Sequence, residues 1–303
     1  MSAEIGRLLT AMVTPFAADG AVDYEAAERL AALLVADGSD GVVVSGTTGE
    51  SPTLSDDEKI ELVKAIKKAI PGKTVVAGTG SNDTHHSVKL SERAMKAGAD
   101  ALLAVVPYYN KPPQEGMYQH FKAISEVGPT IMYNIQGRTA INMTAATTLR
   151  CAELPGIVGV KEASGDLDQI GLVCAGKPPE GFQVWSGDDS WTLAVLAAGG
   201  HGVICVVSHI AGRSMKKLID AHAKGENDIA RKIHLGLLPV IKALMTTAAN
   251  PVPIKSVLNA MGFPAGPFRL PLVPLTKDQL ETVMLAVRAA GDLITFKAGV
   301  KVA

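Results

Sequence analysis

Residues 41–70 read GVVVSGTTGESPTLSDDEKIELVKAIKKAI, and this stretch decides the fold. The run Gly41–Gly46 is apolar but for one serine, which is typical of a strand covered on both faces. After a turn, Ser55–Ile70 carries apolar residues at helical spacing, and Ser55 and Glu58 stand at the spacing of a capping box. A buried strand followed by an amphipathic helix is the building unit of a parallel α/β fold.

The same unit recurs along the chain. Eight strand-like runs can be read, namely Leu8–Phe16, Gly41–Gly46, Thr74–Gly80, Ala101–Tyr109, Thr130–Ile135, Ile157–Ala163, Phe182–Asp188 and Gly202–His209. Helical patterns follow them at Asp23–Ala36, Ser55–Ile70, Asp83–Ala97, Glu115–Val127, Thr144–Glu153, Asp168–Ala175, Ser190–Ala198 and Ala211–Lys224. Eight units of strand then helix predict an α/β fold in which parallel strands close into a (β/α)8 TIM barrel.

An open, doubly wound sheet is the competing fold, and the sequence lacks the signature that such a sheet needs. Gly78-Thr79-Gly80 follows a strand-like run but lacks the third glycine of a dinucleotide-binding fingerprint. Residues 71–74 resemble the tail of a phosphate-binding loop, yet they lack its leading glycine and precede a strand instead of following one. The closed barrel is therefore preferred.

Beyond the eighth unit we predict a C-terminal helical appendage. The chain divides into residues 1–225, the barrel that carries the active site, and residues 226–303, a helical extension packed on the barrel. Helical patterns in the extension cover Asp228–Thr246, Ile254–Met261 and Thr276–Phe296, with a proline-rich bend at residues 263–271 between the last two.

The composition is that of a globular protein. Hydrophobic residues make up 47% of the 303 residues and charged residues 19%, with a formal net charge of -1. No basic block with interleaved aromatic residues occurs, and no run reaches the ~20 apolar residues of a membrane span, so we expect neither nucleic-acid nor membrane partners. The N-terminus lacks a signal-peptide pattern, and Cys151, Cys174 and Cys205 are far apart, which indicates a cytoplasmic protein with reduced thiols.

Polar side chains gather at the predicted ends of the strands. Thr47 and Thr48 follow the second strand, Tyr109 and Tyr133 end the fourth and fifth, and Gly187 lies at the end of the seventh. The C-terminal ends of the strands form the active site in TIM barrels. The phenols and hydroxyls could relay protons there, although a single tyrosine at such a place is more often a rim residue that fills space.

Lys161 is the strongest candidate for a catalytic residue. It follows the buried run Ile157–Val160, and an unpaired ammonium is costly to bury. Burial favours the neutral form of an amine, which can attack a carbonyl carbon and form a Schiff base. Two other interpretations are open at this point, namely a lysine that reaches past the strand end to water and one that pairs with Glu162.

The remaining candidates are weaker. Arg138 lies in the loop after the fifth strand, where a guanidinium suits capture of a carboxylate but equally a surface salt bridge. Gly46 and Gly49 frame a turn whose N–H groups could bind an anion. Asp188 and Asp189 are best interpreted as helix caps. The histidines and cysteines show no metal-ligand spacing, so we expect no metal and no cofactor.

At these motifs the chain resembles the dihydrodipicolinate synthases, within the wider family of pyruvate-dependent Schiff-base lyases. The resemblance covers nearly the whole chain and is carried by residues 9–16, 46–51, 107–112, 133–134, 137–139, 160–166, 186–189, 199–203, 250–251 and 270–275. The motifs up to Lys161 are shared by the wider family, whereas Arg138 between Gly137 and Thr139 resembles the synthases in particular. The resemblance implies a cofactor-free enzyme that condenses pyruvate with L-aspartate 4-semialdehyde in lysine and diaminopimelate biosynthesis.

The resemblance also implies roles in the chemical steps. Lys161 would form the imine with pyruvate, and Tyr133 would transfer protons at the imine and enamine steps. Thr47 would link Tyr133 to Tyr109, which a neighbouring subunit supplies in the family. The enzyme is therefore expected as a homo-oligomer, in the form of a tetramer made of two tight dimers.

Four further residues match the family's substrate-binding positions. Thr48 would hold the pyruvate carboxylate, and Arg138 would receive the carboxylate side of the aldehyde. Gly187 and the backbone carbonyl of Ile204 would line the pocket.

Two departures from the family pattern bear on function. Gln136 stands where the family commonly has proline, which should loosen the Arg138 loop because proline would fix one backbone torsion. The family's lysine-inhibited members carry a histidine and a glutamate in a regulatory pocket, and the matching positions here hold Asp56 and His86. Loss of the glutamate weakens an ammonium site, although Ser51, Asn82 and Tyr108 are kept, so we predict weak or absent inhibition by L-lysine.

Two other functions compete with the synthase. An aldolase or hydratase that cleaves a 2-keto-3-deoxy acid to pyruvate is kept open by Gln136 and opposed by Arg138, because fold and shared mechanism do not fix a substrate. The other is a barrel that binds a keto acid without turnover. The joint presence of Lys161, Tyr133, Thr47, Tyr109 and Arg138 opposes it.

Overall fold

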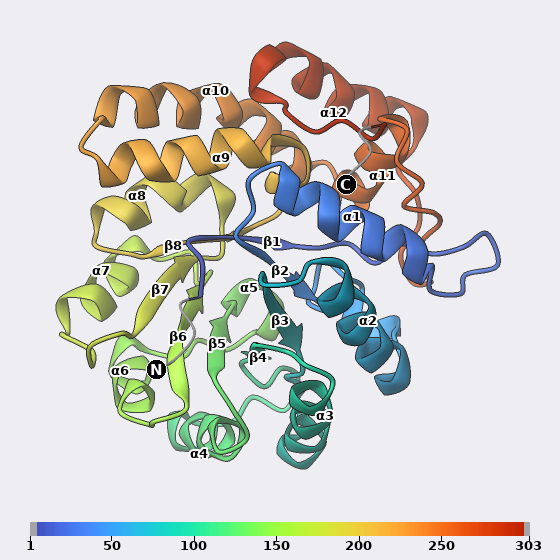
Figure 1. The fold of residues 1–303 in the computed structure, drawn as a ribbon. Helices are drawn as coiled ribbons and strands as arrows, with labels where there is room; N and C mark the ends of the chain where they lie inside the picture. Colours follow the sequence, from blue (N-terminus) through green and yellow to red (C-terminus); the bar gives the residue numbers. More distant parts are fainter. Residues whose placement is uncertain (1–4, 300–303) are drawn as a thin grey trace.

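The computed structural model describes residues 5–299, and its eight strands close into one barrel (Figure 1). Each strand pairs in parallel with the next along the chain, and the first pairs with the eighth. The strands are β1 (Leu8–Ala11), β2 (Gly41–Val44), β3 (Thr74–Gly78), β4 (Ala101–Val105), β5 (Thr130–Asn134), β6 (Ile157–Glu162), β7 (Gln183–Ser186) and β8 (Gly202–Cys205). The predicted (β/α)8 barrel is confirmed.

Apart from the short α5 (Gln136–Thr139), which lies over the strands, the helices between the strands surround the barrel (Figure 1). They are α1 (Tyr24–Ala36), α2 (Asp56–Ala69), α3 (Thr84–Lys96), α4 (Gln114–Ser125), α6 (Ala145–Ala152), α7 (Leu167–Ala175), α8 (Thr192–Ala197) and α9 (Ser208–Ala223), with 3-10 turns η1 (Ser51–Thr53) and η2 (Asp189–Trp191). The capping box of α2 is confirmed, since the Ser55 hydroxyl accepts the Glu58 N–H at 3.2 Å and the Glu58 carboxylate accepts the Ser55 N–H at 2.8 Å.

Several strands end earlier than the apolar runs predicted. β4 ends at Val105 rather than Tyr109, and β8 ends at Cys205 rather than His209. His209 lies in the first turn of α9, fully buried, where its ring bonds to the carbonyl of Val206 and accepts the N–H of Val13. Buried loop residues are as apolar as strand residues, so hydropathy does not mark the last ladder hydrogen bond.

Two apolar cores lie on the two faces of the sheet. Side chains such as Val43, Leu103, Ile131 and Trp185 fill the barrel. A larger core lies between the strands and the surrounding helices. Coverage of both faces explains why the strands are apolar at nearly every position.

The C-terminal segment adds helices on one side of the barrel (Figure 1). They are α10 (Asn227–Thr246), α11 (Val252–Ala260) and α12 (Lys277–Ala289), followed by the 3-10 turn η3 (Gly291–Leu293). α10 packs along α9, and α12 packs on α10 and α11.

The prediction of one helix over Thr276–Phe296 was wrong at its C-terminal end. The helix stops at Ala289, and Gly291 has a φ of 54°, in the left-handed region that often ends helices. Further on, the N–H groups of Thr295 and Phe296 donate to the carbonyl of Ile210. Hydrogen bonds to a distant part of the chain thus replace those that would have continued the helix.

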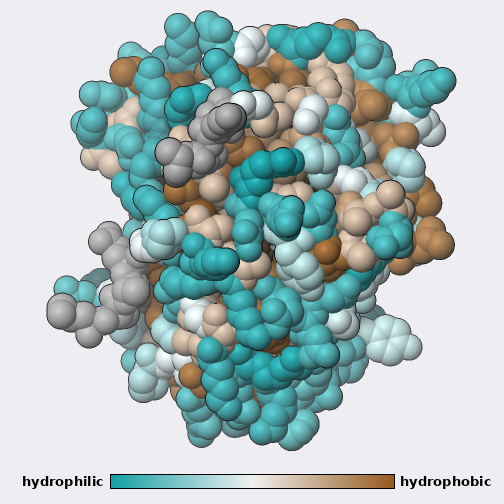
Figure 2. Space-filling view, turned by 45° about the vertical axis from the view of Figure 1, so that its right-hand side comes forward, coloured by the Kyte–Doolittle hydropathy of each residue, from teal (hydrophilic) through white to brown (hydrophobic). Residues whose placement is uncertain are grey.

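No helix within residues 5–299 is both long and apolar enough to cross a membrane. Hydrophilic residues predominate on the face shown in Figure 2, with apolar residues scattered between them.

Candidate active site

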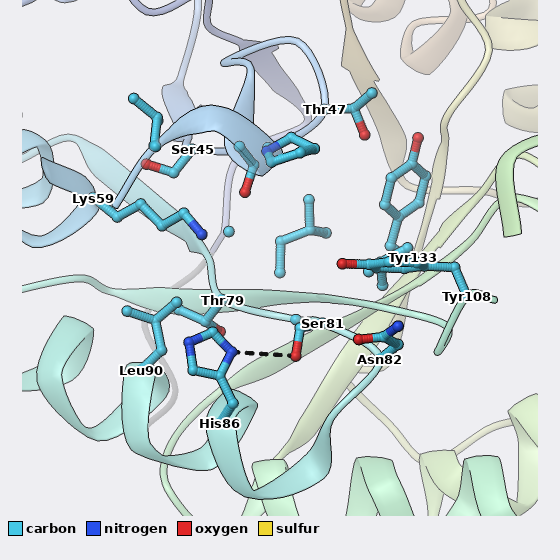
Figure 3. Close-up of a pocket in the computed structure, with 18 of the residues that line it drawn as sticks. Ser45, Thr47, Lys59, Thr79, Ser81, Asn82, His86, Leu90, Tyr108 and Tyr133 are labelled. Atoms are coloured by element: carbon cyan, nitrogen blue, oxygen red, sulfur yellow. Dashed lines mark hydrogen bonds between the residues drawn. The ribbon is translucent and has the colours of Figure 1, made fainter. Parts of the chain in front are cut away.

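A cavity of about 600 Å³ opens beyond the C-terminal ends of β2 to β5 (Figure 3). Its wall includes Ser45, Gly46, Thr47, Thr79, Ser81, Asn82, Tyr108, Tyr133, Ile135, Arg138 and Thr139, and it reaches Asp56, Lys59 and His86 on α2 and α3. Thr47 and Tyr133 lie on one side of the cavity, and Lys59 and His86 on the other (Figure 3). We call these the Tyr133 side and the Lys59 side. The cavity therefore lies at the end of the barrel where active sites form.

Lys161 lies on β6 beside the Tyr133 side, with 6% of its surface exposed. The preceding residue, Val160, belongs to the core outside the barrel, so strand alternation turns Lys161 toward the barrel interior. Its amine lies 4.3 Å from the centre of the Tyr133 ring, on the neighbouring strand and in register. This burial excludes the interpretation that the side chain reaches to water.

Glu162 faces the opposite way and has partners of its own. Its carboxylate accepts hydrogen bonds from the Asn134 amide at 3.1 Å, the Ser164 N–H at 2.9 Å and the Gln169 amide at 3.2 Å. Burial raises the pKa of this carboxyl. Because these donors are its partners in the described chain, the interpretation of a Lys161–Glu162 pair is wrong.

Gly187 and Ile204 lie on the other side of Lys161. A Cβ at Gly187 would come within 3.1 Å of Cε of Lys161 and 2.7 Å of Cβ of Ala163, so glycine leaves room for the lysine side chain. Ile204 lies on β8, is 1% exposed and belongs to the core inside the barrel. Tyr133 is the residue that both lines the cavity and contacts the Lys161 amine.

Thr47 and Thr48 lie in a tight turn after β2. The Gly49 N–H closes the turn by donating to the carbonyl of Gly46 at 3.0 Å. Thr47 lines the cavity, whereas Thr48 is buried and its hydroxyl accepts a hydrogen bond from the Asn250 amide at 3.0 Å. The N–H groups of the two threonines donate no hydrogen bond within residues 5–299, which suits them to an anionic ligand.

Arg138 lies in α5, the short helix after β5. It is part of the cavity wall, and its guanidinium donates to the backbone carbonyl of Asn250 at 3.1 Å. The Thr139 hydroxyl donates to the carbonyls of Ile135 and Ile141, and this holds the loop in which Gln136 replaces proline. Asn250 thus contacts both Thr48 and Arg138, a link between distant segments that the sequence did not indicate.

Tyr109 does not join the other candidates within one chain. It lies in the loop after β4, is 87% exposed, has a φ of 72° and is not part of the cavity wall. Its neighbour Tyr108 lines the cavity instead, close to Asn82 (Figure 3).

The acidic pair after β7 serves two purposes. Asp188 caps η2, where its carboxylate accepts the Ser190 N–H at 2.8 Å, as predicted. Asp189 is buried, and its carboxylate accepts the N–H groups of Val206 and Val207 beyond β8. Burial raises the pKa of Asp189 to about 6. The prediction of a helix N-cap role does not describe Asp189, because its carboxylate binds N–H groups beyond β8, which only the closed barrel brings beside it.

The Lys59 side holds charges of both signs. Nε2 of His86 lies 2.8 Å from Oδ2 of Asp56, and the Lys59 amine lies 4.0 Å from the other carboxylate oxygen. The Lys59 side chain points into the cavity (Figure 3). Burial lowers the pKa of Lys59, against the opposing effect of Asp56.

The histidines, cysteines and acids of the described chain do not cluster. Residues 5–299 contain no group of three or more histidines, cysteines and acids placed to hold a metal ion. Cys151 and Cys205 are buried, Cys174 is half-buried, and all three are free thiols.

The chain is similar in sequence to a family of known proteins. The model of a family described as the dihydrodipicolinate synthetase family matches residues 4–290. The chain is 53% identical over 291 residues to the 4-hydroxy-tetrahydrodipicolinate synthase of Moorella thermoacetica, with 95% of this chain and 99% of the relative covered.

Solved structures agree with the sequence comparison. DHDPS from Cyanidioschyzon merolae, with lysine bound, superposes with a TM-score of 0.92 at 43% identity, over 95% of this chain and 98% of the other. A structure described as the first monomeric dihydrodipicolinate synthase variant gives a TM-score of 0.92 at 40% identity, over 95% and 97% of the two chains.

Proposed function

The chain belongs to the dihydrodipicolinate synthetase family, and we propose that it works through an imine that Lys161 forms with pyruvate. It is a lyase with the activity of a 4-hydroxy-tetrahydrodipicolinate synthase, which condenses pyruvate with L-aspartate 4-semialdehyde. The reaction belongs to lysine and diaminopimelate biosynthesis. The observation that carries the imine proposal is the buried Lys161 amine, 4.3 Å from the centre of the Tyr133 ring.

The imine accounts for the chemistry without a cofactor. The amine adds to the keto carbon of pyruvate, and loss of water gives the imine. The imine withdraws electrons from the methyl carbon, so a proton leaves and an enamine forms. The enamine carbon attacks the aldehyde, and the amino group of that substrate then closes the ring and releases Lys161.

Proton transfers in these steps fall to Tyr133. Its ring contacts the Lys161 amine and lines the cavity, so its phenol can serve both imine formation and enamine formation. Thr47 lines the same side of the cavity and would pass protons on.

Tyr109 is the third member of the proposed relay, and it implies an oligomer. Its ring is 87% exposed and does not line the cavity of its own chain, so we assign it to the site of a second copy. The working form would be a homotetramer made of two tight dimers. Sedimentation at several concentrations tests this, and a fully active monomer would contradict it.

The two substrate carboxylates have different partners in this proposal. The turn with Thr48 offers backbone N–H groups to the pyruvate carboxylate. Arg138 keeps guanidinium N–H groups beyond the one bound to Asn250, which suits it to the carboxylate of the aldehyde substrate. Gly187 and the Ile204 carbonyl would border the imine.

Feedback by L-lysine is proposed to be weak or absent. The carboxylate of Asp56 is already bound to His86, and the Lys59 amine points into the same part of the cavity. A ligand ammonium there would meet a like charge. The relative from Cyanidioschyzon merolae, by contrast, has lysine bound.

We also assign the protein to the cytoplasm. Its three cysteines are free thiols, which fits a reducing compartment.

The direct test measures turnover and imine formation together. Purified protein is assayed with pyruvate and L-aspartate 4-semialdehyde, coupled to a reductase that consumes the cyclic product. In parallel, borohydride is added with pyruvate and the mass of the peptide that contains Lys161 is measured. Turnover with a trapped adduct on Lys161 supports the proposal. An adduct without turnover would redirect the search to 2-keto-3-deoxy sugar acids, and no adduct would reject the imine.

A further inference from the structure

The most deeply buried ion pair within residues 5–299 joins the Thr47–Thr48 turn to the C-terminal helices. Nζ of Lys255 on α11 lies 2.7 Å from Oε1 of Glu50, and both side chains are 0% exposed. Glu50 comes two residues after Thr48 in the chain. The ring centres of Phe16 and Phe268 lie 4.0 and 5.2 Å from the Lys255 amine, so aromatic side chains enclose the pair.

An ion pair in such surroundings is a poor source of stability. Both charges lose their water, and two apolar side chains of similar size often stabilise a protein as well or better. The pair instead fixes geometry, because its short, charged hydrogen bond holds Glu50 and Lys255 in one relative position.

Glu50 holds the turn in an unusual conformation. Its φ is 56°, in the left-handed region that costs a non-glycine residue energy. Its N–H donates to the carbonyl of Thr47 at 3.2 Å, which ties it to the turn. Its second carboxylate oxygen accepts the backbone N–H of Arg269 at 3.2 Å. Both oxygens of one side chain thus anchor the turn to the C-terminal segment.

The same segment also holds the two proposed carboxylate-binding residues. Asn250, just before α11, donates to the Thr48 hydroxyl at 3.0 Å and accepts from Arg138 at 3.1 Å. Lys255 lies in the first turns of α11, and its N–H donates to the carbonyl of Pro251. A shift of α11 relative to the turn would therefore move Thr48 and Arg138 apart or together.

We infer that Glu50 and Lys255 are positioning residues of the reaction. Their buried pair holds the Thr47–Thr48 turn at the distance from Arg138 that the two substrate carboxylates require. The inference rests on the proposed function, in which Thr48 receives pyruvate and Arg138 the aldehyde. The C-terminal segment is then part of the framework of the active site.

The test compares three variants, Lys255→Met, Glu50→Gln and the two combined. Lys255→Met leaves a buried carboxylate without its partner, and we expect the KM for pyruvate to rise about 10- to 100-fold, on the scale of a small misplacement of binding groups. Imine trapping at low pyruvate concentration should fall in parallel. The combined variant removes both charges, so it should regain thermal stability but keep the raised KM.

A matched control separates positioning from general destabilisation. Lys67 and Asp100 form a half-buried ion pair at 2.6 Å, and neither residue is part of the cavity wall. Lys67→Met should lower the melting temperature and leave the KM for pyruvate unchanged.

Each outcome decides the matter. A combined variant that is stable and has the wild-type KM would overturn the positioning role. If Lys255→Met fails to fold, Glu50→Gln and the combined variant give the answer by the same KM readout. Wild-type protein that traps no pyruvate would instead reject the proposed function itself, which keeps the two failures apart.

Discussion

Lys161 and Lys255 are both buried, yet they are accommodated in different ways. Lys255 has the carboxylate of Glu50 at 2.7 Å, whereas Lys161 faces the Tyr133 ring, with its amine 4.3 Å from the ring centre. No acid forms an ion pair with Lys161 in the part of the chain that the structure describes. Burial alone therefore does not mark a reactive lysine. The informative observation is a buried lysine that forms no ion pair within residues 5–299, at the end of a barrel strand.

Replacement of Lys161 should have the largest effect on catalysis, and it tests whether Lys161 rather than Lys255 is the reactive lysine. Lys161→Ala should lower kcat/KM by at least about a thousandfold, because removal of a covalent nucleophile acts on that scale or above. The melting temperature should change little, since no ion pair is broken. Steady-state kinetics and borohydride trapping measure the result. A variant that still traps pyruvate would break the comparison.

Lys255→Met should have the opposite profile. The substitution leaves the buried Glu50 carboxylate without its partner, so the free energy of unfolding should fall by about 3–5 kcal/mol. Lys161 is untouched, and saturating pyruvate should still be trapped by borohydride. Urea denaturation measures the stability, and an unchanged unfolding free energy would show that the pair is not formed.

Arg138→Ala should have a smaller effect, confined to the second substrate. Loss of a charged hydrogen bond of about 1.5–3 kcal/mol corresponds to a roughly 10- to 150-fold fall in kcat/KM for the aldehyde. Arg138→Lys keeps the charge but not the forked geometry, and it should recover only part of the loss. Trapping of pyruvate should be unchanged in both variants, and a loss of trapping would assign Arg138 to pyruvate instead.

The pair between Glu58 and Arg269 gives a pH-dependent effect of about 1 kcal/mol or less, because solvent reaches it. The two nitrogens of Arg269 lie 2.6 and 2.9 Å from the Glu58 oxygens, and these hydrogen bonds lower the pKa of Glu58 from 4.5 to about 2. A lowered folded-state pKa stabilises the fold above about pH 4.5, and this contribution is lost as the pH falls toward 2. The difference in melting temperature between wild type and Glu58→Gln should therefore shrink over that range. A constant difference would contradict the pair.

L-lysine should have the smallest effect of all. Lys59 differs from both buried lysines, since its side chain is 14% exposed and its amine lies 4.0 Å from Asp56. Its charge opposes a ligand ammonium, so we expect no inhibition by L-lysine up to about 1 mM. A titration of the initial rate tests this, and strong inhibition below that concentration would show that the Lys59 side accepts a cation.

Much of the proposed site could be predicted because its residues stand out from their local surroundings. Lys161 interrupts an apolar strand, and Thr47, Tyr133 and Arg138 lie at or just after strand ends, where a barrel collects its polar groups. The structure places the last three in one cavity wall. Lys255 gave no such signal, because a lysine within a helical pattern is ordinarily a solvated one.

The sequence by itself determined the order of strands and helices and the place of Lys161 in a buried strand. Hydrophobic patterning is a local property, and it specifies which segments form strands and helices. Only the tertiary structure decided the contacts between distant segments, such as Glu50 with Lys255, 205 residues apart, and Asp189 with the N–H groups beyond β8. It also decided where α12 ends. These features depend on closure of the barrel and on docking of the C-terminal helices, which no local pattern encodes.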